Sequence, residues 1–406
     1  MLVIMVVAIV GTYLVLGSHA AAPYASITAE SGTLSGSASK QSCSGASSND
    51  GNCVVFGGTS TSTGTRGWAK IENGTLESDQ NTLLRGGTLW DVPFVQPQYD
   101  YATSQGGYNP WPVFGQYKLN AVRLAVEYGT PQTGTAKTNP NYSNECAPWS
   151  ASAPVLSLSQ AMSVLTSQVA EAVANHMYAI IDLHCTSGGH DMTTAPTFWT
   201  DVAKQFGNNS NVIFELLNEP VAWEPVNYTD TGTTSSTTGY NNDIQDEETL
   251  YNDIRAVDTQ TPIIMMSFAV PTNNDSTPLQ APTMAQVVAK LTGINWSNTA
   301  VGFHGYWDTN DTDETNLKAS YPAIDTEFQS PCPPPSGEAA VVCPNGETSK
   351  NGMTWEEQTM EKDGISWLCW NCNDAPDQPG ADDVSNLGVM EAAAQAEGWM
   401  WTADNP

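Results

Sequence analysis

The sequence predicts an α/β protein, a (β/α)8 barrel that follows a short N-terminal extension rich in Ser, Gly and Thr. From about Trp68 onward, short runs of β-branched residues alternate with longer segments of helical periodicity. This alternation is typical of βα units, which build a parallel sheet. The alternative is a doubly wound sheet, but no Gly-rich phosphate turn opens a helix in the sequence. We therefore expect the sheet to close into a barrel.

The candidate strands are short and mostly apolar, and they comprise residues 82–85, 121–126, 178–184, 212–218, 263–268, 300–304, 323–327 and 365–370. The candidate helices between and after them comprise residues 158–176, 196–207, 246–258, 284–291, 354–362 and 383–397. Residues 158–176 have the clearest apolar periodicity of these helices. Six of the eight strands are thus followed by a helical segment, as expected of βα units.

The charge of the chain excludes several partners. Asp and Glu number 43 against 13 Lys and Arg, which gives a net charge of −30. Because a polyanion needs a basic face, nucleic acid is excluded as a partner, and anionic lipids and polyuronic substrates are disfavoured. Charged residues make up only 14% of the chain, which favours an exported protein with a polar, uncharged surface.

The N-terminus predicts export. Residues 1–16 are almost wholly apolar, and small residues follow from Gly17 to Ala22. This pattern is typical of a signal peptide, although the run is close to the length that spans a bilayer. We expect residues 1–22 to be a signal peptide of a secreted protein, or otherwise an uncleaved membrane anchor that faces outward. Residues 23–66 are then a spacer with strand-like segments, and residues 67–406 form the barrel.

Eight cysteines follow the export signal, and an even number in an oxidising compartment predicts disulfides. Pairing of close neighbours joins Cys43 to Cys53, Cys332 to Cys343 and Cys369 to Cys372, and leaves Cys146 with Cys185. The sequence does not fix this connectivity. Three clusters have residue types that bind metals. Cys369 and Cys372 have the spacing of half a zinc site, but no second pair accompanies them. Residues 184–191 follow a strand in a loop and include Cys185, which we expect to be oxidised, and the acidic segment 308–314 lacks the spacing of a calcium loop. We expect no metal or cofactor, and we expect the acidic segment to be a solvated loop.

Functional residues of a barrel lie where its strands end, at the C-terminal face. Polar and aromatic residues recur at these positions, and they are Arg123, His184, Asn218, Glu219, His304, Tyr306, Glu327 and Trp370. Strands four and seven face each other across the opening, so Glu219 and Glu327 can flank one glycosidic bond. A separation of about 5–5.5 Å suits a retaining double displacement.

Each remaining residue has a role in this hypothesis. Glu327 attacks as an ionised nucleophile, which Arg123 and Tyr306 hold by charge and hydrogen bonding. Glu219 acts first as acid and then as base. His304 orients Glu219 or binds a sugar hydroxyl.

The motifs around these residues resemble those of glycoside hydrolase family 5, the cellulase-type retaining glycosidases of clan A. Residues 212–220, with the sequence VIFELLNEP, are similar to the strand-four motif of that family, which ends in Asn-Glu-Pro. Residues 84–87, 121–124, 180–184 and 364–370 resemble its strands one, two, three and eight. The resemblance covers about residues 68–401.

The resemblance implies that Glu219 is the acid/base, that Glu327 is the nucleophile and that Trp370 forms the floor of the −1 subsite. Asn218 would bind the 2-hydroxyl of the sugar, and His184 would also contact substrate. The implied activity is that of an exported endo-β-1,4-glucanase, a monomer that acts on β-glucan or a related plant or microbial polysaccharide.

The substrate stays open at this point. The family often has Gly two residues after the nucleophile, whereas this chain has Gln329 there. Segments rich in Pro and Cys (331–344) and in Thr and Ser (229–239) lie beside the expected cleft. A β-mannanase or β-1,3-glucanase of the same fold is one alternative. A non-catalytic surface glycan-binding protein is another, although such a protein does not need both carboxylates.

Overall fold

The computed structural model describes residues 38–42, 52–56, 65–92, 114, 119–126, 128, 157–184, 191–221, 240–269, 282–305, 312–329 and 360–370. The chain divides into two units, residues 1–62 and 63–406. The first unit contains an antiparallel hairpin of β1 (Ala38–Ser42) and β2 (Asn52–Phe56). The expected division into residues 1–22, 23–66 and 67–406 stays a prediction. In the described ranges, no helix has both the length and the apolar composition needed to cross a membrane.

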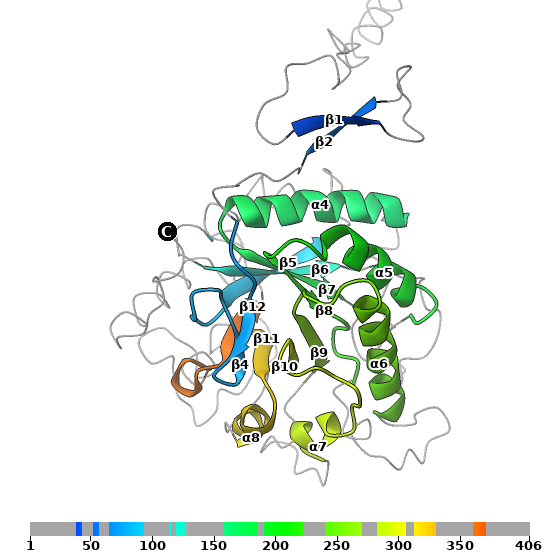
Figure 1. Ribbon diagram of the computed structural model, residues 1–406. Coiled ribbons are helices and arrows are strands. Elements are labelled where there is room, and N and C mark those ends of the chain that lie inside the picture. Colours follow the sequence, from blue (N-terminus) through cyan, green and yellow to red (C-terminus); the bar gives the residue numbers. More distant parts are fainter. Residues whose placement is uncertain are drawn as a thin grey trace, which may run out of the picture. The chain divides into compact units, whose positions relative to one another are not determined.

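The second unit is a closed parallel barrel (Figure 1). Its strands within the described residues are β5 (Arg85–Val92), β6 (Ala121–Val126), β7 (Tyr178–Leu183), β8 (Val212–Glu215), β9 (Ile263–Phe268), β10 (Thr299–His304), β11 (Ala323–Gln329) and β12 (Ser366–Trp370). Each strand pairs in parallel with the next, and β12 pairs with β5 to close the ring. The predicted (β/α)8 barrel is confirmed.

The helices lie around the outside of this barrel (Figure 1). They are α4 (Leu158–Ala174), α5 (Ala195–Phe206), α6 (Asn241–Arg255), α7 (Met284–Val288) and α8 (Thr312–Ser320). A capping box starts α4, because the Ser157 hydroxyl accepts the N–H of Gln160 while the Gln160 side chain accepts the N–H of Ser157. The buried residues of α4 recur at helical spacing and pack on the sheet.

The acidic segment was predicted wrongly at its end. Asp313 and Glu314 lie in the first turn of α8, and both side chains are buried rather than solvated. Their carboxyl groups lie near the positive end of the helix dipole, which favours acidic residues in a first turn.

Side chains of two layers build the core. Inward-facing residues fill the barrel, among them Ile180, Ile213, Ile264 and Leu368. The residues that alternate with them, such as Ile181, pack between the sheet and the helices. Period-two alternation along each strand therefore separates the barrel interior from the outer core.

A close contact at Gly86 shows why strand one continues beyond its predicted end. Residues 82–85 were predicted as this strand, but β5 runs through Gly86 and beyond. A Cβ atom at Gly86 would lie 2.2 Å from the carbonyl oxygen of Ala121 and 2.7 Å from Leu368 Cδ2. The glycine therefore permits close packing of β5 inside the closed sheet and does not end the strand.

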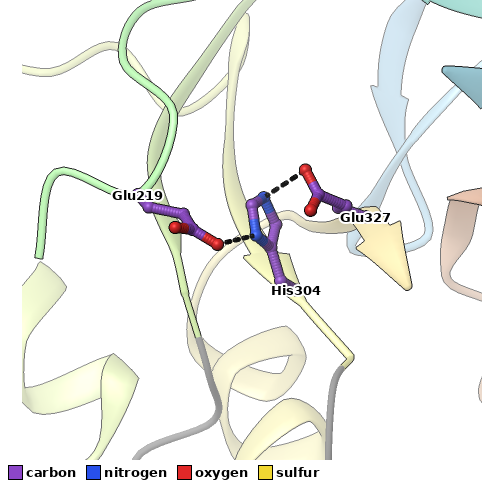
Figure 2. Close-up of side chains that lie close together, drawn as sticks. All are labelled: Glu219, His304 and Glu327. Atoms are coloured by element: carbon purple, nitrogen blue, oxygen red, sulfur yellow. Dashed lines mark hydrogen bonds and ion pairs between the residues drawn. The ribbon is translucent and has the colours of Figure 1, made fainter. Parts of the chain in front are cut away.

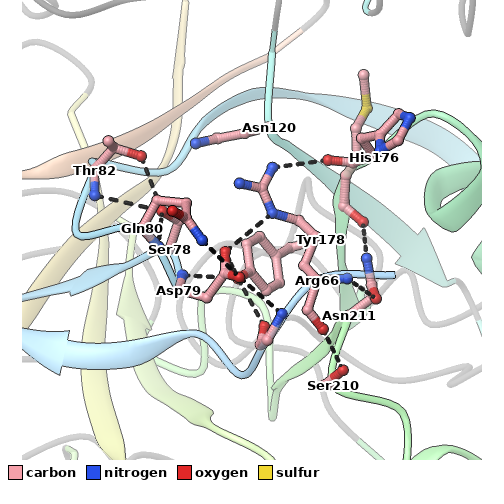
Figure 3. A network of polar contacts seen from close by, with 12 residues as sticks. Arg66, Ser78, Asp79, Gln80, Thr82, Asn120, His176, Tyr178, Ser210 and Asn211 are labelled. Carbon is pink, nitrogen blue, oxygen red and sulfur yellow. Dashed lines mark hydrogen bonds and ion pairs between the residues drawn. The ribbon is translucent and has the colours of Figure 1, made fainter. Parts of the chain in front are cut away.

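Residues 65–84 close the N-terminal end of the barrel, and the short hairpin of β3 (Lys70–Glu72) and β4 (Thr75–Glu77) lies within them. The backbone N–H of Arg66 donates to Asn211 Oδ1 (2.9 Å), and its guanidinium lies 5.0 Å from the centroid of the Tyr178 ring. The Tyr178 hydroxyl donates to the carbonyl oxygen of Gly67 (2.8 Å) and accepts the N–H of Asp79 (2.9 Å). Figure 3 shows this network, which lies where β7 and β8 begin.

Candidate active site

Buried polar side chains replace apolar ones toward the C-terminal ends of three adjacent strands. On β6, Arg123 follows Ala121 at the next inward position. On β7, Asp182 follows Ile180 in the same way, and on β8 Glu215 follows Ile213. All three polar side chains have no exposed surface. Because side chains alternate between faces, these three project into the barrel interior.

Arg123 is the centre of this polar layer. Its Nε and Nη2 atoms donate to both carboxylate oxygens of Glu215 (2.7 and 3.0 Å). Its Nη1 atom donates to Glu327 Oε2 (2.7 Å), and Nη2 also donates to Asn218 Oδ1 (2.7 Å). Nη2 further lies 3.0 Å from Asp182 Oδ2. One planar guanidinium thereby joins residues from four strands or strand ends, and nearby carboxylates raise its pKa although burial acts to lower it.

His304 lies between the two glutamates that the sequence singled out (Figure 2). Its Nδ1 atom is 3.0 Å from Glu219 Oε1, and its Nε2 atom is 3.8 Å from Glu327 Oε2. One ring nitrogen of His304 and one carboxylate oxygen from each glutamate all lie within 4.8 Å of one another. Burial lowers the pKa of His304 to about 4, although the Glu327 charge acts to raise it. A neutral imidazole therefore separates the two carboxyl groups at neutral pH.

Asp182 links His184 to the same network. Its Oδ2 atom lies 2.7 Å from His184 Nδ1 and forms an ion pair with Arg123 Nη2 at 3.0 Å. Burial raises the pKa of Asp182 to about 7, against the lowering effect of Arg123. Burial also lowers the pKa of His184 to about 4. With His184 neutral, its Nδ1–H donates to Asp182 and its Nε2 atom is an acceptor.

Irregular backbone at the strand ends aims several of these groups. Glu219 has a left-handed φ of 46°, which is rare for a residue with a side chain and recurs at functional sites. On β9, Met266 has a φ of 71°, and the register with β10 shifts beside it. The next residue, Ser267, turns inward and donates its hydroxyl to Glu215 Oε1 (2.6 Å).

The structure brings together most of the predicted site residues. Arg123, Asn218, Glu219, His304 and Glu327 lie in one network, and His184 joins it through a neighbouring carboxylate. Two further predicted residues are not described in full. Residue 306 lies outside the described ranges, and residue 370 ends β12 with only its backbone described.

Sequence reasoning missed four members of the site, namely Asp182, Glu215, Ser267 and Asp325. A usable signal was present, because three of them are charged residues inside otherwise apolar strands. A buried charge is retained only where it has a partner or a task.

The described residues that could bind a metal also have other partners. Glu327 already has the Arg123 guanidinium as its positive partner. In the segment 184–191, the described residue Asp191 accepts the N–H and hydroxyl of Thr193 (2.9 and 2.5 Å) in the turn before α5. The expectation of no metal stays a prediction, since Glu219, His304 and Glu327 together offer atoms that a cation could also bind.

Comparisons with known proteins show the family of the chain. Residues 114–376 match the family model described as Cellulase (glycosyl hydrolase family 5). Endoglucanase Z from Dickeya dadantii is 44% identical over 54 residues, which cover 13% of this chain and 13% of that protein. The chain therefore spans only a small part of the length of this curated relative.

Solved structures share the fold at low sequence identity. The native form of a β-glucanase from Saccharophagus degradans has a TM-score of 0.53 and 16% identity, over 82% of this chain and 94% of that one. The catalytic domain of an endoglucanase from Thermobifida fusca has a TM-score of 0.50 and 16% identity, over 81% of this chain and 98% of that one. Since the family match spans more than half of the sequence, the chain belongs to glycosyl hydrolase family 5, the cellulase family, and is a glycoside hydrolase.

Proposed function

We propose that the chain is a retaining endo-β-1,4-glucanase in which Glu327 is the nucleophile and Glu219 is the acid/base. The observation that supports this most directly is the convergence of the two carboxyl groups on His304, with one oxygen of each glutamate and one ring nitrogen all within 4.8 Å of one another. Retaining enzymes hold their carboxyl groups about 5–5.5 Å apart, whereas inverting enzymes need about 6.5–9.5 Å to admit a water.

In the first step, Glu327 attacks the anomeric carbon and the bond to the leaving sugar breaks. Glu219 gives its proton to the departing oxygen, and a covalent glycosyl ester forms on Glu327. In the second step, Glu219 takes a proton from water, which displaces Glu327 from the sugar. Arg123 lies 2.7 Å from Glu327 and compensates the charge of its carboxylate in the free enzyme, before the attack and after the sugar is released.

The substrate assignment rests on likeness. The curated relative is called an endoglucanase, and the β-glucanase from Saccharophagus degradans has been solved with cellotetraose at a TM-score of 0.52 to this chain. We therefore put β-1,4-glucan first, with β-mannan and β-1,3-glucan as the other substrates to test.

We also propose that the enzyme is secreted, with membrane anchoring as the alternative, and that it acts as a monomer. Support comes from the apolar residues 1–22 and from the eight cysteines. Cys369 is disulfide-bonded. Its pairing with Cys372 stays a prediction.

A substrate panel tests the activity. Wild-type protein should release reducing sugar from carboxymethyl-cellulose faster than from mannan or laminarin, and NMR should show β-configured first products. Glu219→Ala should lower kcat by about 10²–10⁴-fold, because general acid catalysis is lost. Glu327→Ala should lower it further, since no covalent intermediate can form.

The matched control is Glu171→Ala, which removes an exposed carboxylate on α4 and should leave hydrolysis unchanged. Wild-type protein that binds but never cleaves any of the three glycans would instead support a glycan-binding role. Products with inverted configuration would refute the double displacement.

A further inference from the structure

Strand β11, which carries Glu327, contains one extra residue. Against β10, Phe303 is opposite Asp325, but the next residue, His304, is opposite Glu327. The ladder on the other side, with β12, shifts at the same place. Both ladders therefore locate a β-bulge between Asp325 and Phe328.

The bulge decides which way Glu327 points. Ile324 belongs to the barrel interior, and Ala323 belongs to the outer core. Uninterrupted alternation from Ile324 would turn Glu327 outward and Phe328 inward. Instead, Glu327 meets Arg123 inside the barrel, and Phe328 packs in the outer core. The inserted residue thus turns the Glu327 carboxylate from the outer face of the strand to the face inside the barrel.

The carboxyl group of Asp325 bridges the backbone at this bulge. Its Oδ1 atom accepts the N–H of Glu327 (3.2 Å) and the N–H of Gly305 (3.3 Å). Gly305 directly follows His304, so one oxygen atom ties the end of β10 to the end of β11. Asp325 has no exposed surface, and among the described residues its Oδ2 atom has no hydrogen-bond partner.

The charge state of Asp325 fits this task. Burial raises the pKa of Asp325 well above its usual range, although the N–H groups of Glu327 and Gly305 act to lower it. The charged groups that face it are Glu327, which also raises the pKa, and Arg123, which lowers it. A neutral carboxyl group still accepts backbone N–H groups, and it adds no negative charge beside Glu327.

We propose that Asp325 is a positioning residue, whose carboxyl oxygen stabilises the bulge that turns Glu327 into the barrel beside His304. This inference rests on the proposed role of Glu327 as nucleophile. It assigns to Asp325 an effect on the rate of attack and none on the binding of the polysaccharide, because its contacts are to backbone groups of the strand ends.

Two substitutions distinguish the effect of the Asp325 acceptor oxygen from the effect of its charge. Asp325→Asn keeps an acceptor oxygen of the same shape, so kcat should stay within about 3-fold of wild type and the pH profile of kcat/KM should not move. Asp325→Ala removes both hydrogen bonds and should lower kcat by about 10–100-fold with little change in KM. If the Asn variant loses as much activity as the Ala variant, the acceptor role is refuted.

A matched control exists at the other end of the barrel. Asp258 is also buried, and its Oδ1 atom accepts the N–H of Gln260 (2.9 Å) two residues later, before β9 begins. Asp258→Ala removes the same kind of hydrogen bond, from a backbone N–H to the side chain two residues earlier. It should therefore lower the melting temperature but leave kcat unchanged. Equal losses of kcat in Asp258→Ala and Asp325→Ala would show that the effect is only structural.

Covalent labelling distinguishes this inference from the proposed function. A 2-deoxy-2-fluoro cellobioside with a good leaving group should esterify Glu327 in wild-type protein, as peptide mass spectrometry can detect. Asp325→Ala should be labelled about 10–100-fold more slowly. If wild-type Glu327 is not labelled, the proposed function fails; if Asp325→Ala is labelled at the wild-type rate, only the positioning role fails.

Discussion

Arg123 is a shared partner that no other cationic side chain can replace. Its guanidinium contacts Glu215, Glu327, Asn218 and Asp182 at 2.7–3.0 Å inside a fully buried site. A lysine ammonium offers a compact charge without the planar arrangement of donors that spans these acceptors. The orientation of Glu327 is therefore coupled to that of Asn218 through a single side chain.

We expect Arg123→Lys to lower kcat by at least about 100-fold, because the developing charge at the reaction centre loses an oriented donor. The free energy of unfolding should fall by on the order of 3 kcal/mol, since the buried carboxylates lose charge-assisted hydrogen bonds that one ammonium group cannot replace. Steady-state kinetics and thermal melts measure both. Arg255→Lys is the control, because Arg255 is half-buried on α6 and donates to the carbonyl oxygen of Thr261. A fully active Arg123→Lys variant would contradict the shared role.

Residues at the ends of predicted strands were easier to single out than charged residues inside an apolar run. Glu219 stood out because it comes soon after the apolar residues Leu216 and Leu217, and Glu327 because the predicted strand 323–327 ended there, although β11 continues to Gln329. Glu215 lies inside such a run, and its significance comes from Arg123, which is 92 positions away in the sequence. Pairing across that distance is a product of barrel closure, so strand composition alone does not reveal it.

At the scale of elements, continuous apolar runs gave accurate bounds. Strands β6 and β9 match their predicted ranges because each is buried along its whole length. Helix α8 was missed because only Leu317 among its apolar residues is buried, so the periodicity is weak. The bulge in β11 also escaped prediction, since an inserted residue has no signature in composition.

A buried ion pair joins elements far apart in the chain where the barrel closes. Arg85 on β5 contacts both carboxylate oxygens of Glu361 (2.5 and 3.0 Å), just before β12. The Trp367 indole N–H also donates to Glu361 (2.9 Å). Both charged side chains are almost fully buried, so this contact fastens the first strand to the last.

Glu361→Gln should therefore destabilise the fold by about 3 kcal/mol, because the Arg85 charge stays buried without its partner. Lys204→Gln removes an exposed ion pair to Asp201 and should change stability by less than about 1 kcal/mol. Guanidinium unfolding followed by tryptophan fluorescence compares the two variants. Equal shifts would mean that closure does not depend on the buried pair.

At the scale of the whole molecule, buried titratable groups make stability depend on pH. Burial raises the pKa of Asp182 to about 7 and the pKa values of Asp325 and Glu247 well above the usual range. These groups hold protons that the unfolded chain releases near pH 4, so their stabilisation is lost as pH rises. His184 and His304 act oppositely between about pH 6.5 and 4, since the unfolded chain takes up their protons first.

In mild acid the buried carboxyl groups and the two histidines change the stability in opposite directions with pH. Above about pH 7 only the carboxyl groups still make the stability depend on pH. We expect the melting temperature to be highest in mild acid and to fall between about pH 7 and 9. Glu247→Gln replaces a neutral carboxyl group on α6 with a neutral amide and should make this fall shallower. Calorimetry across the pH range measures both effects, and a melting temperature that rises toward pH 9 would contradict the assignment.

The network at the base of the barrel has a consequence for how a polymer meets the enzyme. Arg66 and Tyr178 seal one mouth, and packed side chains such as Ile213 and Ile264 fill the interior. No polysaccharide strand can thread through such a solid cylinder. Under the proposed endoglucanase activity, a long glycan would rest sideways over the opposite rim, where its two ends need not enter the barrel for a bond in its middle to reach the carboxylates.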